Sequence, residues 1–376
     1  MPKLTLSFTS GVAVAAAAIW HFWRHRKSTP NLGAYTQKIQ TSSRKCQEWF
    51  DRGCVWAYNL HRQEALACFQ KAAEADPSCG MAHWGIAFAN GPEYNFNESG
   101  GFYMAAAQPA GFPSFKVATE AIQLAIAALR PDSPPRERAL IEALATLFEW
   151  PVTPDAAKRK VAYADAMEAV AQRPAFASDG DIQSLAADAL MLLAPWALYE
   201  ADKTPKPIAL RVKTVLDRGL LACPRHPYLC HLRIHADEMG PVEAFDWAAA
   251  EALRATDAVD AGHLLHMPTH LDIQVGEYER AIEWNRKAVA ADLRQLARAP
   301  ERFSIYTGYT VHNMEFCAWA AMYAGCRAVA LEASTHLEAF LDQAKLTAAP
   351  HLPTFFEAYL STRLMVRCGW FEPAVL

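Results

Sequence analysis

The sequence predicts an all-α fold in which antiparallel helix hairpins stack into a solenoid. Helical periodicity runs from about residue 44 to residue 368, and alternating β-branched runs with hairpin turns do not occur. A glycine followed five residues later by an alanine recurs, as Gly276 with Ala281 and Gly325 with Ala330. The glycine suits a tight turn between helices, and the alanine suits their close crossing. A solenoid can hold all of residues 44–376 as one body.

The first hairpin has the clearest repeat signal. Seven residues follow the 34-residue spacing of tetratricopeptide (TPR) repeats, with Trp in place of Tyr at the third position: Trp49, Gly53, Trp56, Ala65, Phe69, Ala72 and Pro77. Each such hairpin buries its apolar face only by stacking on a neighbour. We therefore predict a TPR-like array.

Beyond this hairpin the chain alternates between one irregular segment and many helices. Residues 90–113 are rich in Gly, Pro and Asn, which predicts a long irregular loop that is either functional or mobile. Helices are expected at about 114–130, 136–149, 155–173, 181–200, 206–222, 227–239, 241–256, 260–275, 277–296, 303–324, 326–345 and 350–367. The last helix has an apolar face and no hairpin partner after it, which predicts a cap, further sequence, or an oligomer formed through this helix.

The N-terminus predicts a membrane anchor. Residues 4–23 carry no formal charge, end in Trp-rich sequence and precede a basic cluster at 24–27. We predict a single-pass anchor within residues 1–27, a polar linker at 28–43, and a body that faces the cytoplasm. A cleaved signal peptide of a secreted protein, and a peripheral tail on a soluble cytoplasmic protein, are the alternatives. Nine cysteines without a CxxC pair favour reduced thiols and argue against secretion.

Charge and motif content exclude several function classes. A net charge of −4 with scattered basic residues gives no footprint for nucleic acid. Phosphate-binding loops and nucleophile elbows are absent from the sequence.

The most informative motif is Gly-His-Leu-Leu-His-Met-Pro-Thr-His at residues 262–270. His263, His266 and His270 are spaced i, i+3, i+7 and share one face of a helix. With Gly276 at the turn position, they occupy repeat positions 2, 5 and 9, which line the concave groove of a TPR array. The same frame one hairpin later places His312 at position 2.

A third helix adds further candidate ligands. His231, His235 and Glu238 are spaced i, i+4, i+7, again on one face. Their repeat register stays ambiguous, because Gly240 and Ala244 suggest frames one residue apart.

This residue pattern predicts a metal site in the groove. Neutral imidazole is a ligand for Zn, Cu, Fe and Ni, and six histidines exceed what one zinc ion requires. A copper or iron centre, with one or two ions, fits such a set. Glu238 and Tyr309 are candidates for proton transfer, and Tyr306 and Trp196 for contact with a substrate. The structural alternative is that the histidines bond across helices and the aromatic residues only pack.

Pro268 bears on the same motif. A proline inside a helix bends it, which would re-aim the histidines. A helix that begins near Met267 is the alternative, and it would disperse His263 and His266.

Six sequence blocks together resemble a known family. They are Glu-Trp-Phe-Asp-Arg-Gly at 48–53, Cys-Gly-Met-Ala-His-Trp-Gly-Ile-Ala at 79–87, Ala-Leu-Met at 189–191 with Pro195-Trp196, His-Leu-Arg-Ile-His at 231–235, the 262–270 motif, and residues 306–313 followed by Ala-Ala-Met at 320–322. In these blocks the chain resembles the large TPR-repeat proteins of bacteria and fungi, from about residue 35 to its end. The resemblance implies an α-solenoid body. Arg62 stands where family members carry His, and members are usually longer.

Two functions follow as hypotheses. The first is a metal-dependent enzyme, using Cu, Fe or Zn, that acts oxidatively on a small apolar or aromatic molecule in a biosynthetic pathway. The second is a non-catalytic scaffold that binds a protein or peptide partner in the groove. Peptide-binding TPR grooves usually present Lys, Arg and Asn, whereas this face presents His and Tyr, which favours the enzyme.

Overall fold

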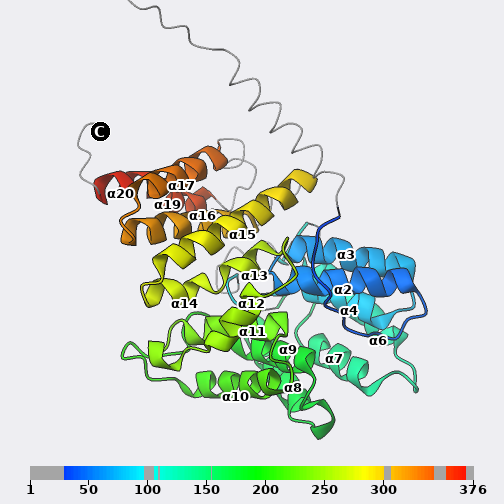
Figure 1. Cartoon of the computed structure of the whole chain (residues 1–376). Helices are drawn as coiled ribbons and strands as arrows, with labels where there is room; N and C mark the ends of the chain where they lie inside the picture. The colour runs from blue at the N-terminus through cyan, green and yellow to red at the C-terminus, as the bar shows by residue number, and fades with distance from the viewer. Residues whose placement is uncertain are drawn as a thin grey trace, which may run out of the picture.

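The computed structural model describes residues 29–96, 106–108, 111–153, 155–299, 306–342 and 353–369. Helices that follow one another along the chain pack against each other (Figure 1). Within these ranges no strand forms, and an isolated bridge pairs Tyr199 with Pro205. The predicted all-α, solenoid-like fold is confirmed.

Glycines allow the first three helices of the array to pack closely. These helices are α2 (Arg44–Tyr58), α3 (Arg62–Ala75) and α4 (Gly80–Ala89). Phe69 of α3 packs directly on the backbones of α2 and α4. A Cβ atom at Gly53 would lie 2.5 Å from the Phe69 ring, and one at Gly85 would lie 2.4 Å from it. Only glycine therefore lets the three helices approach this closely.

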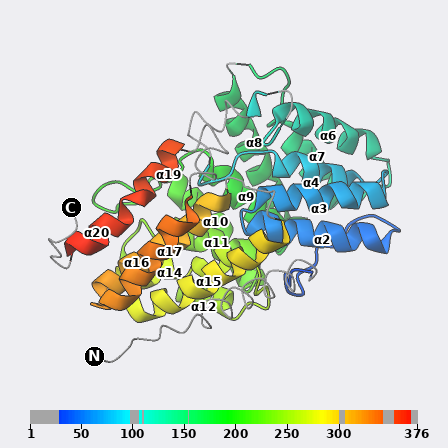
Figure 2. The same ribbon diagram turned by 90° about the horizontal axis from the view of Figure 1, so that it is seen from above.

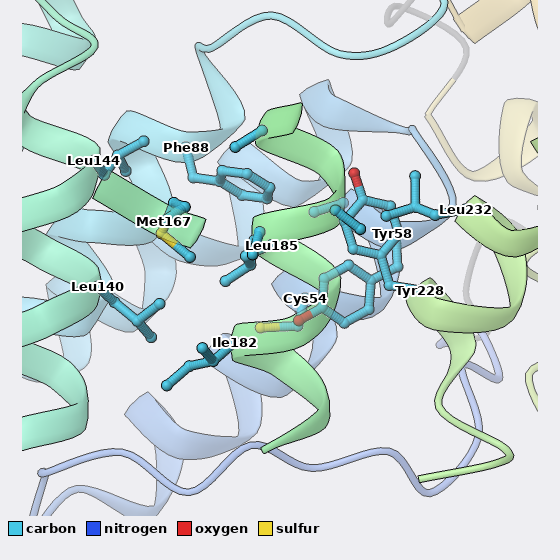
Figure 3. Packing of buried hydrophobic residues seen from close by; sticks show 14 of the residues in the cluster. Cys54, Tyr58, Phe88, Leu140, Leu144, Met167, Ile182, Leu185, Tyr228 and Leu232 are labelled. Carbon is cyan, nitrogen blue, oxygen red and sulfur yellow. The ribbon is translucent and has the colours of Figure 1, made fainter. Parts of the chain in front are cut away.

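The middle helices continue the same core. They are α6 (Phe115–Ala128), α7 (Pro135–Ala145), α8 (Ala156–Ala171), α9 (Gly180–Met191), α10 (Pro207–Ala222) and α11 (Pro227–Asp237). A proline occupies the first turn of α7, α10 and α11, where no backbone N–H is needed. Figure 3 shows Leu140, Met167 and Leu185 of three successive helices in the same buried cluster as Phe88 of α4.

The remaining helices complete the array. They are η2 (Val242–Ala244), α12 (Trp247–Arg254), α13 (Gly262–His266), α14 (Thr269–Gln274), α15 (Tyr278–Arg298), α16 (Tyr306–Tyr323), α17 (Arg327–Phe340), α19 (Pro353–Leu360) and α20 (Thr362–Gly369). Gly276 and Gly325 adopt φ of +83° and +70° at the two predicted turns. Ala281 and Ala330 are fully buried, as the repeat frame predicted.

Several helices are shorter than the sequence suggested. The helix predicted at 181–200 ends at Met191, before Pro195, and the one predicted at 241–256 becomes a short 3-10 turn followed by α12. The helix predicted at 260–275 is divided at Met267 and Pro268, and the last one at Ser361. The last helix is also not isolated, since α20 packs against α16 and α17 and buries Val366.

The array curves so that its two ends approach a common centre. Figure 2 shows α3–α7 on one side and α16–α20 on the other, with the green and yellow helices between them. The carbonyl of Tyr58, at the end of α2, bonds His231 of α11. Asn59 bonds the backbone of Leu264 in α13 and the hydroxyl of Tyr306 in α16. The chain segment after α2 therefore lies inside the array, beside the histidine motifs.

The described part of the predicted linker packs on the body. Leu32 and Ile39 are buried, and the Tyr35 hydroxyl donates a hydrogen bond to Asp181 of α9. The N–H of Asn31 donates to the Asp260 carboxylate, and the N–H of Asp260 donates to the carbonyl of Asn31. Residues 29–43 therefore form an extended strap across several helices.

The predicted membrane localisation needs correction. The predicted span, residues 4–23, lies outside the described residues. Across the part of the chain that the structure describes, no helix is both long and apolar enough to cross a bilayer. On this finding the prediction of a single-pass membrane protein is withdrawn.

All nine cysteines fall within the described residues. Each is a free thiol, and six of them are buried. This agrees with the prediction of reduced thiols that pack as small hydrophobic side chains.

Candidate metal centre

Six histidines from four helices meet in the interior of the array. His231 and His235 come from α11, His263 and His266 from α13, His270 from α14 and His312 from α16. The first five are buried, with at most 6% of any side chain exposed. The predicted groove histidines therefore do gather, and they do so inside the protein. They form two adjacent triads.

The first triad consists of His231, His235 and His263. One ring nitrogen from each lies within 4.8 Å of the other two. The Nδ1–H of His231 donates to the carbonyl of Tyr58 at 2.7 Å, and that of His235 donates to Glu238 at 2.6 Å. Their Nε2 atoms, and both ring nitrogens of His263, have no hydrogen-bond partner among the described residues. Buried nitrogens without partners are costly, and a metal ion would satisfy them.

The second triad consists of His266, His270 and His312, whose ligand atoms meet the same 4.8 Å limit. The Nδ1 of His266 lies 2.7 Å from the side-chain oxygen of Asn285, whose amide nitrogen is itself engaged by the carbonyl of Ala281. The Nδ1 of His270 lies 2.7 Å from Glu238. Both Nδ1 atoms face acceptors and therefore carry the proton.

This arrangement leaves two lone pairs facing each other. The Nε2 atoms of His266 and His270 are 2.9 Å apart. When each ring carries a single proton, on Nδ1, neither Nε2 can donate to the other. The repulsion is relieved only by a cation shared between them, either an extra proton or a metal ion. Ligand nitrogens around one ion lie ~3.3 Å apart in tetrahedral geometry, so a small ring movement suffices.

Glu238 connects the two triads. One carboxylate oxygen accepts from His235 of the first triad and the other accepts from His270 of the second. Metal-bound histidines commonly donate their second N–H to a carboxylate or a carbonyl, which fixes the tautomer and raises ligand basicity. The rings of His263 and His266 are also close, with centroids 5.7 Å apart. The triads thus form one six-histidine cluster.

The electrostatics favour neutral imidazoles around an anionic carboxylate. Burial holds the pKa of His231, His263 and His266 well below the ordinary histidine value, and lowers that of His312 to about 3. Burial alone would raise the pKa of Glu238, but the imidazoles of His270 and His235 keep it below its usual range. Deprotonated nitrogens are the form that binds metal.

The backbone of α13 is fixed by two distant side chains. Ala261 precedes this helix and offers no side-chain cap. The N–H of His263 donates to the Tyr306 hydroxyl at 3.2 Å, and the N–H of Leu264 donates to Asn59 at 3.0 Å. These bonds satisfy first-turn N–H groups that a helix leaves without partners. They also fix the position of His263.

A close helix approach completes this arrangement. A Cβ atom at Gly262 would lie 1.9 Å from the carboxylate of Asp292 in α15. That carboxylate accepts hydrogen bonds from Tyr306 and Asn313, both at 2.8 Å. Burial raises the pKa of Asp292 to about 7.

A cavity of about 260 Å³ opens beside the cluster. His235, His263, His270 and His312 form one of its walls. The other residues that line it are Asn95, Phe96, Trp196, Gly308, Tyr309 and Tyr359. The size suits a small molecule, since drug-sized ligands occupy pockets of about 300–1,000 Å³.

The predicted substrate and catalytic residues divide into two groups. Trp196 and Tyr309 line the cavity, and the Tyr309 ring lies 4.4 Å from that of His263. Glu238 lies behind the imidazoles, and Tyr306 lies outside the cavity lining, where it stacks on His61 and braces α13.

Sequence reasoning missed a second group of residues. Tyr58 and Asn285 hold imidazoles, and Asn95 and Phe96 line the cavity. Glu93 accepts a hydrogen bond from Tyr309. The irregular composition of residues 90–113 was the only signal for the last three.

Arg62 stands where the TPR proteins that the sequence resembles carry a histidine, and it contacts a buried carboxylate. It lies 3.8 Å from Glu93 and donates to the carbonyl of Phe88 at 3.0 Å. Burial raises the pKa of Glu93 to about 7, and the Arg62 charge opposes this rise. Arg62 therefore belongs to the buried polar group behind Tyr309.

Comparison with known proteins yields no relative. No family model matches this chain, and no curated protein matches it either. The two His triads positioned to hold a metal ion are therefore assigned from their geometry alone.

Proposed function

We propose that this protein is a copper-dependent enzyme that oxidises a small molecule in the cavity beside the six-histidine cluster. One observation carries the proposal: two buried His triads lie side by side, and four of their six rings have the second nitrogen held by an acceptor. Such support is characteristic of metal-binding imidazoles. Histidines that only pack helices together would have both nitrogens paired.

The donor set favours copper. Every converging donor among the described residues is an imidazole nitrogen, and the one nearby carboxylate, Glu238, is already engaged by two N–H groups. Dinuclear iron and manganese sites in helical proteins use several carboxylate ligands. For a given nitrogen site, copper(II) has the highest affinity among the divalent metals of its row.

Bound in this position, two copper ions would supply two-electron redox chemistry with O2 as the oxidant. The balance is two substrate molecules, each losing two electrons and two protons, for each O2 reduced to two waters. Two electrons per substrate match one pair of copper ions. This gives a reason for two adjacent triads.

The chain's own residues would bind the substrate and handle its protons. Trp196 and Phe96 line the cavity with apolar surface, and the Trp196 ring lies 5.7 Å from that of His235. The Tyr309 hydroxyl donates to Glu93, whose pKa of about 7 allows proton exchange near neutral pH. A substrate proton could therefore leave through Tyr309 and Glu93.

The scaffold hypothesis receives less support from the site. A peptide-binding groove needs a long exposed face, whereas these imidazoles are mostly buried and the cavity beside them measures about 260 Å³. The resemblance to bacterial and fungal TPR proteins stays a prediction. It is compatible with either function, because fold does not determine activity.

Oxygen consumption tests the proposal. Protein loaded with copper, mixed with a panel of phenols and indoles, should consume O2 with at least one substrate. His263→Ala should abolish this uptake, whereas His336→Ala, at an exposed histidine of α17, should not. Uptake that is equal in the His263 variant would reject the site, and metal-loaded protein without uptake on any substrate would reject the oxidative activity.

A further inference from the structure

The cavity lining selects against charged ligands. Apart from imidazoles, the described residues around it are aromatic, amide or glycine, with no Lys, Arg, Asp or Glu. Without bound metal, an ionic substrate would lose its hydration there without gaining a partner of opposite charge from the protein. The four aromatic residues, Phe96, Trp196, Tyr309 and Tyr359, offer flat apolar surface instead.

Trp196 is held in place at some conformational cost. Its backbone has φ of +54°, a region that costs a non-glycine residue about 1–2 kcal/mol. The N–H of Trp196 donates to the Tyr94 hydroxyl at 3.0 Å, and the two rings are 5.2 Å apart. Strained backbone of this kind concentrates at ligand sites. The indole is half exposed and forms part of the cavity wall.

The segment that holds Trp196 also supplies a polar recognition group. Asn95 follows Tyr94 directly and lines the cavity. Its amide is a hydrogen-bond partner of Tyr309 and opposes the rise in the pKa of that hydroxyl. The Asn95 side-chain oxygen is buried and has no partner among the described residues. Solvent does not reach this oxygen, so a ligand in the cavity can bond it only when the Asn95 side chain turns toward the cavity. A buried acceptor without a donor costs about 1–3 kcal/mol, and a ligand that donates to it after this turn gains affinity.

We propose that the cavity recognises a neutral aromatic molecule that carries a hydroxyl or ring N–H, with Trp196 against its ring and the Asn95 oxygen accepting its proton. This inference rests on the proposed function only in that it assigns the substrate class of the same cavity. Binding itself needs no turnover. Phenols and indoles have this chemistry, whereas their ethers and aromatic carboxylates do not.

Calorimetry under nitrogen tests the proposal with three bicyclic probes. 2-Naphthol should bind the full-length protein at one site after its metal has been removed with a chelator, so that no probe can bind the metal. 2-Methoxynaphthalene, which lacks the donor, should bind at least about fivefold more weakly, and 2-naphthoate should not bind measurably. Naphthoate binding as tight as naphthol, or equal affinity of naphthol and its ether, would overturn the assignment.

Three variants test which residues distinguish 2-naphthol from its methyl ether. Asn95→Leu should weaken naphthol to the level of the ether and leave the ether unchanged. Trp196→Ala should weaken both by a similar factor, and Tyr323→Ala, at an exposed tyrosine of α16, should weaken neither. If Asn95→Leu leaves the ratio of naphthol affinity to ether affinity unchanged, the ligand assignment is also overturned.

Copper measurements on the same samples distinguish a failure of the ligand proposal from a failure of the metal proposal. Their copper content is measured directly, with and without prior chelator treatment. Selective naphthol binding by protein that takes up no copper would reject the metal proposal and leave the ligand assignment standing. Protein that takes up copper but does not select naphthol after the metal is removed would reject the ligand assignment and leave the metal proposal standing.

Discussion

Gly262→Ala perturbs the point where the first His-bearing turn of α13 approaches α15. The new Cβ would lie 1.9 Å from the Asp292 carboxylate and 2.9 Å from the carbonyl of Ala288. Alanine gains at most about 1 kcal/mol of helix propensity over glycine. Against this, Asp292 can move only by disturbing its two hydrogen bonds, each worth about 0.5–1.5 kcal/mol, and overpacking costs about 1–3 kcal/mol. We expect a net loss of about 1–3 kcal/mol.

The displaced helix should also weaken metal binding, because α13 carries two of the six histidines. Urea unfolding measures the free energy of unfolding, and a copper titration measures affinity, which should fall about 10-fold or more. Gly325→Ala is the matched control. Its φ is +70° with nothing within 4 Å, so alanine there costs about 1–2 kcal/mol of stability and leaves the site intact. A Gly262 variant equal to wild type in both measurements would refute the packing argument.

Three further predictions address the groups around the cluster. Tyr306→Phe leaves the His263 N–H and the Asn59 amide without their shared acceptor, so urea unfolding should show a loss of about 2–4 kcal/mol; a loss only in ligand affinity would contradict the bracing role. The folded protein keeps a proton on Asp292, with its pKa of about 7, that the unfolded chain releases near pH 4, so stability falls as pH rises from 4 to 7. Asp292→Asn should reduce the difference in unfolding free energy between pH 5 and pH 7.5, and an unchanged difference would show that other groups cause it. Glu238→Gln offers one acceptor where two imidazole N–H groups need one each, so copper affinity should fall about 10–100-fold, and equal affinity would exclude the bridging role.

Periodicity in the sequence predicted much of the histidine cluster. The i, i+3, i+7 spacing of His263, His266 and His270 places them on one face, and a break at Pro268 does not separate them. The repeat frame from Gly325 correctly brought His312 to the same place. The spacing of His231 and His235 also predicted a shared face, although the frame of α11 was ambiguous.

Long-range contacts account for what the sequence did not reveal. The array curves until residues near 58 and 93 reach the cluster, and no local pattern encodes that curvature. Tyr58 contributes a backbone carbonyl, which leaves no trace in residue type. The expected long groove is a compact cavity for the same reason, since Asn95 and Phe96 form part of its lining. Trp196 leaves the predicted helix because α9 ends before Pro195.

Copper stoichiometry tests the central claim most directly. We predict two ions per chain for wild-type protein, about one for His263→Ala, about one for His312→Ala, and none for the double variant, since each change disables one triad. His336→Ala should retain two, and circular dichroism should be unchanged throughout. Wild-type protein that retains no metal after incubation with Cu, Fe and Zn, or a stoichiometry indifferent to both triad variants, would contradict the account.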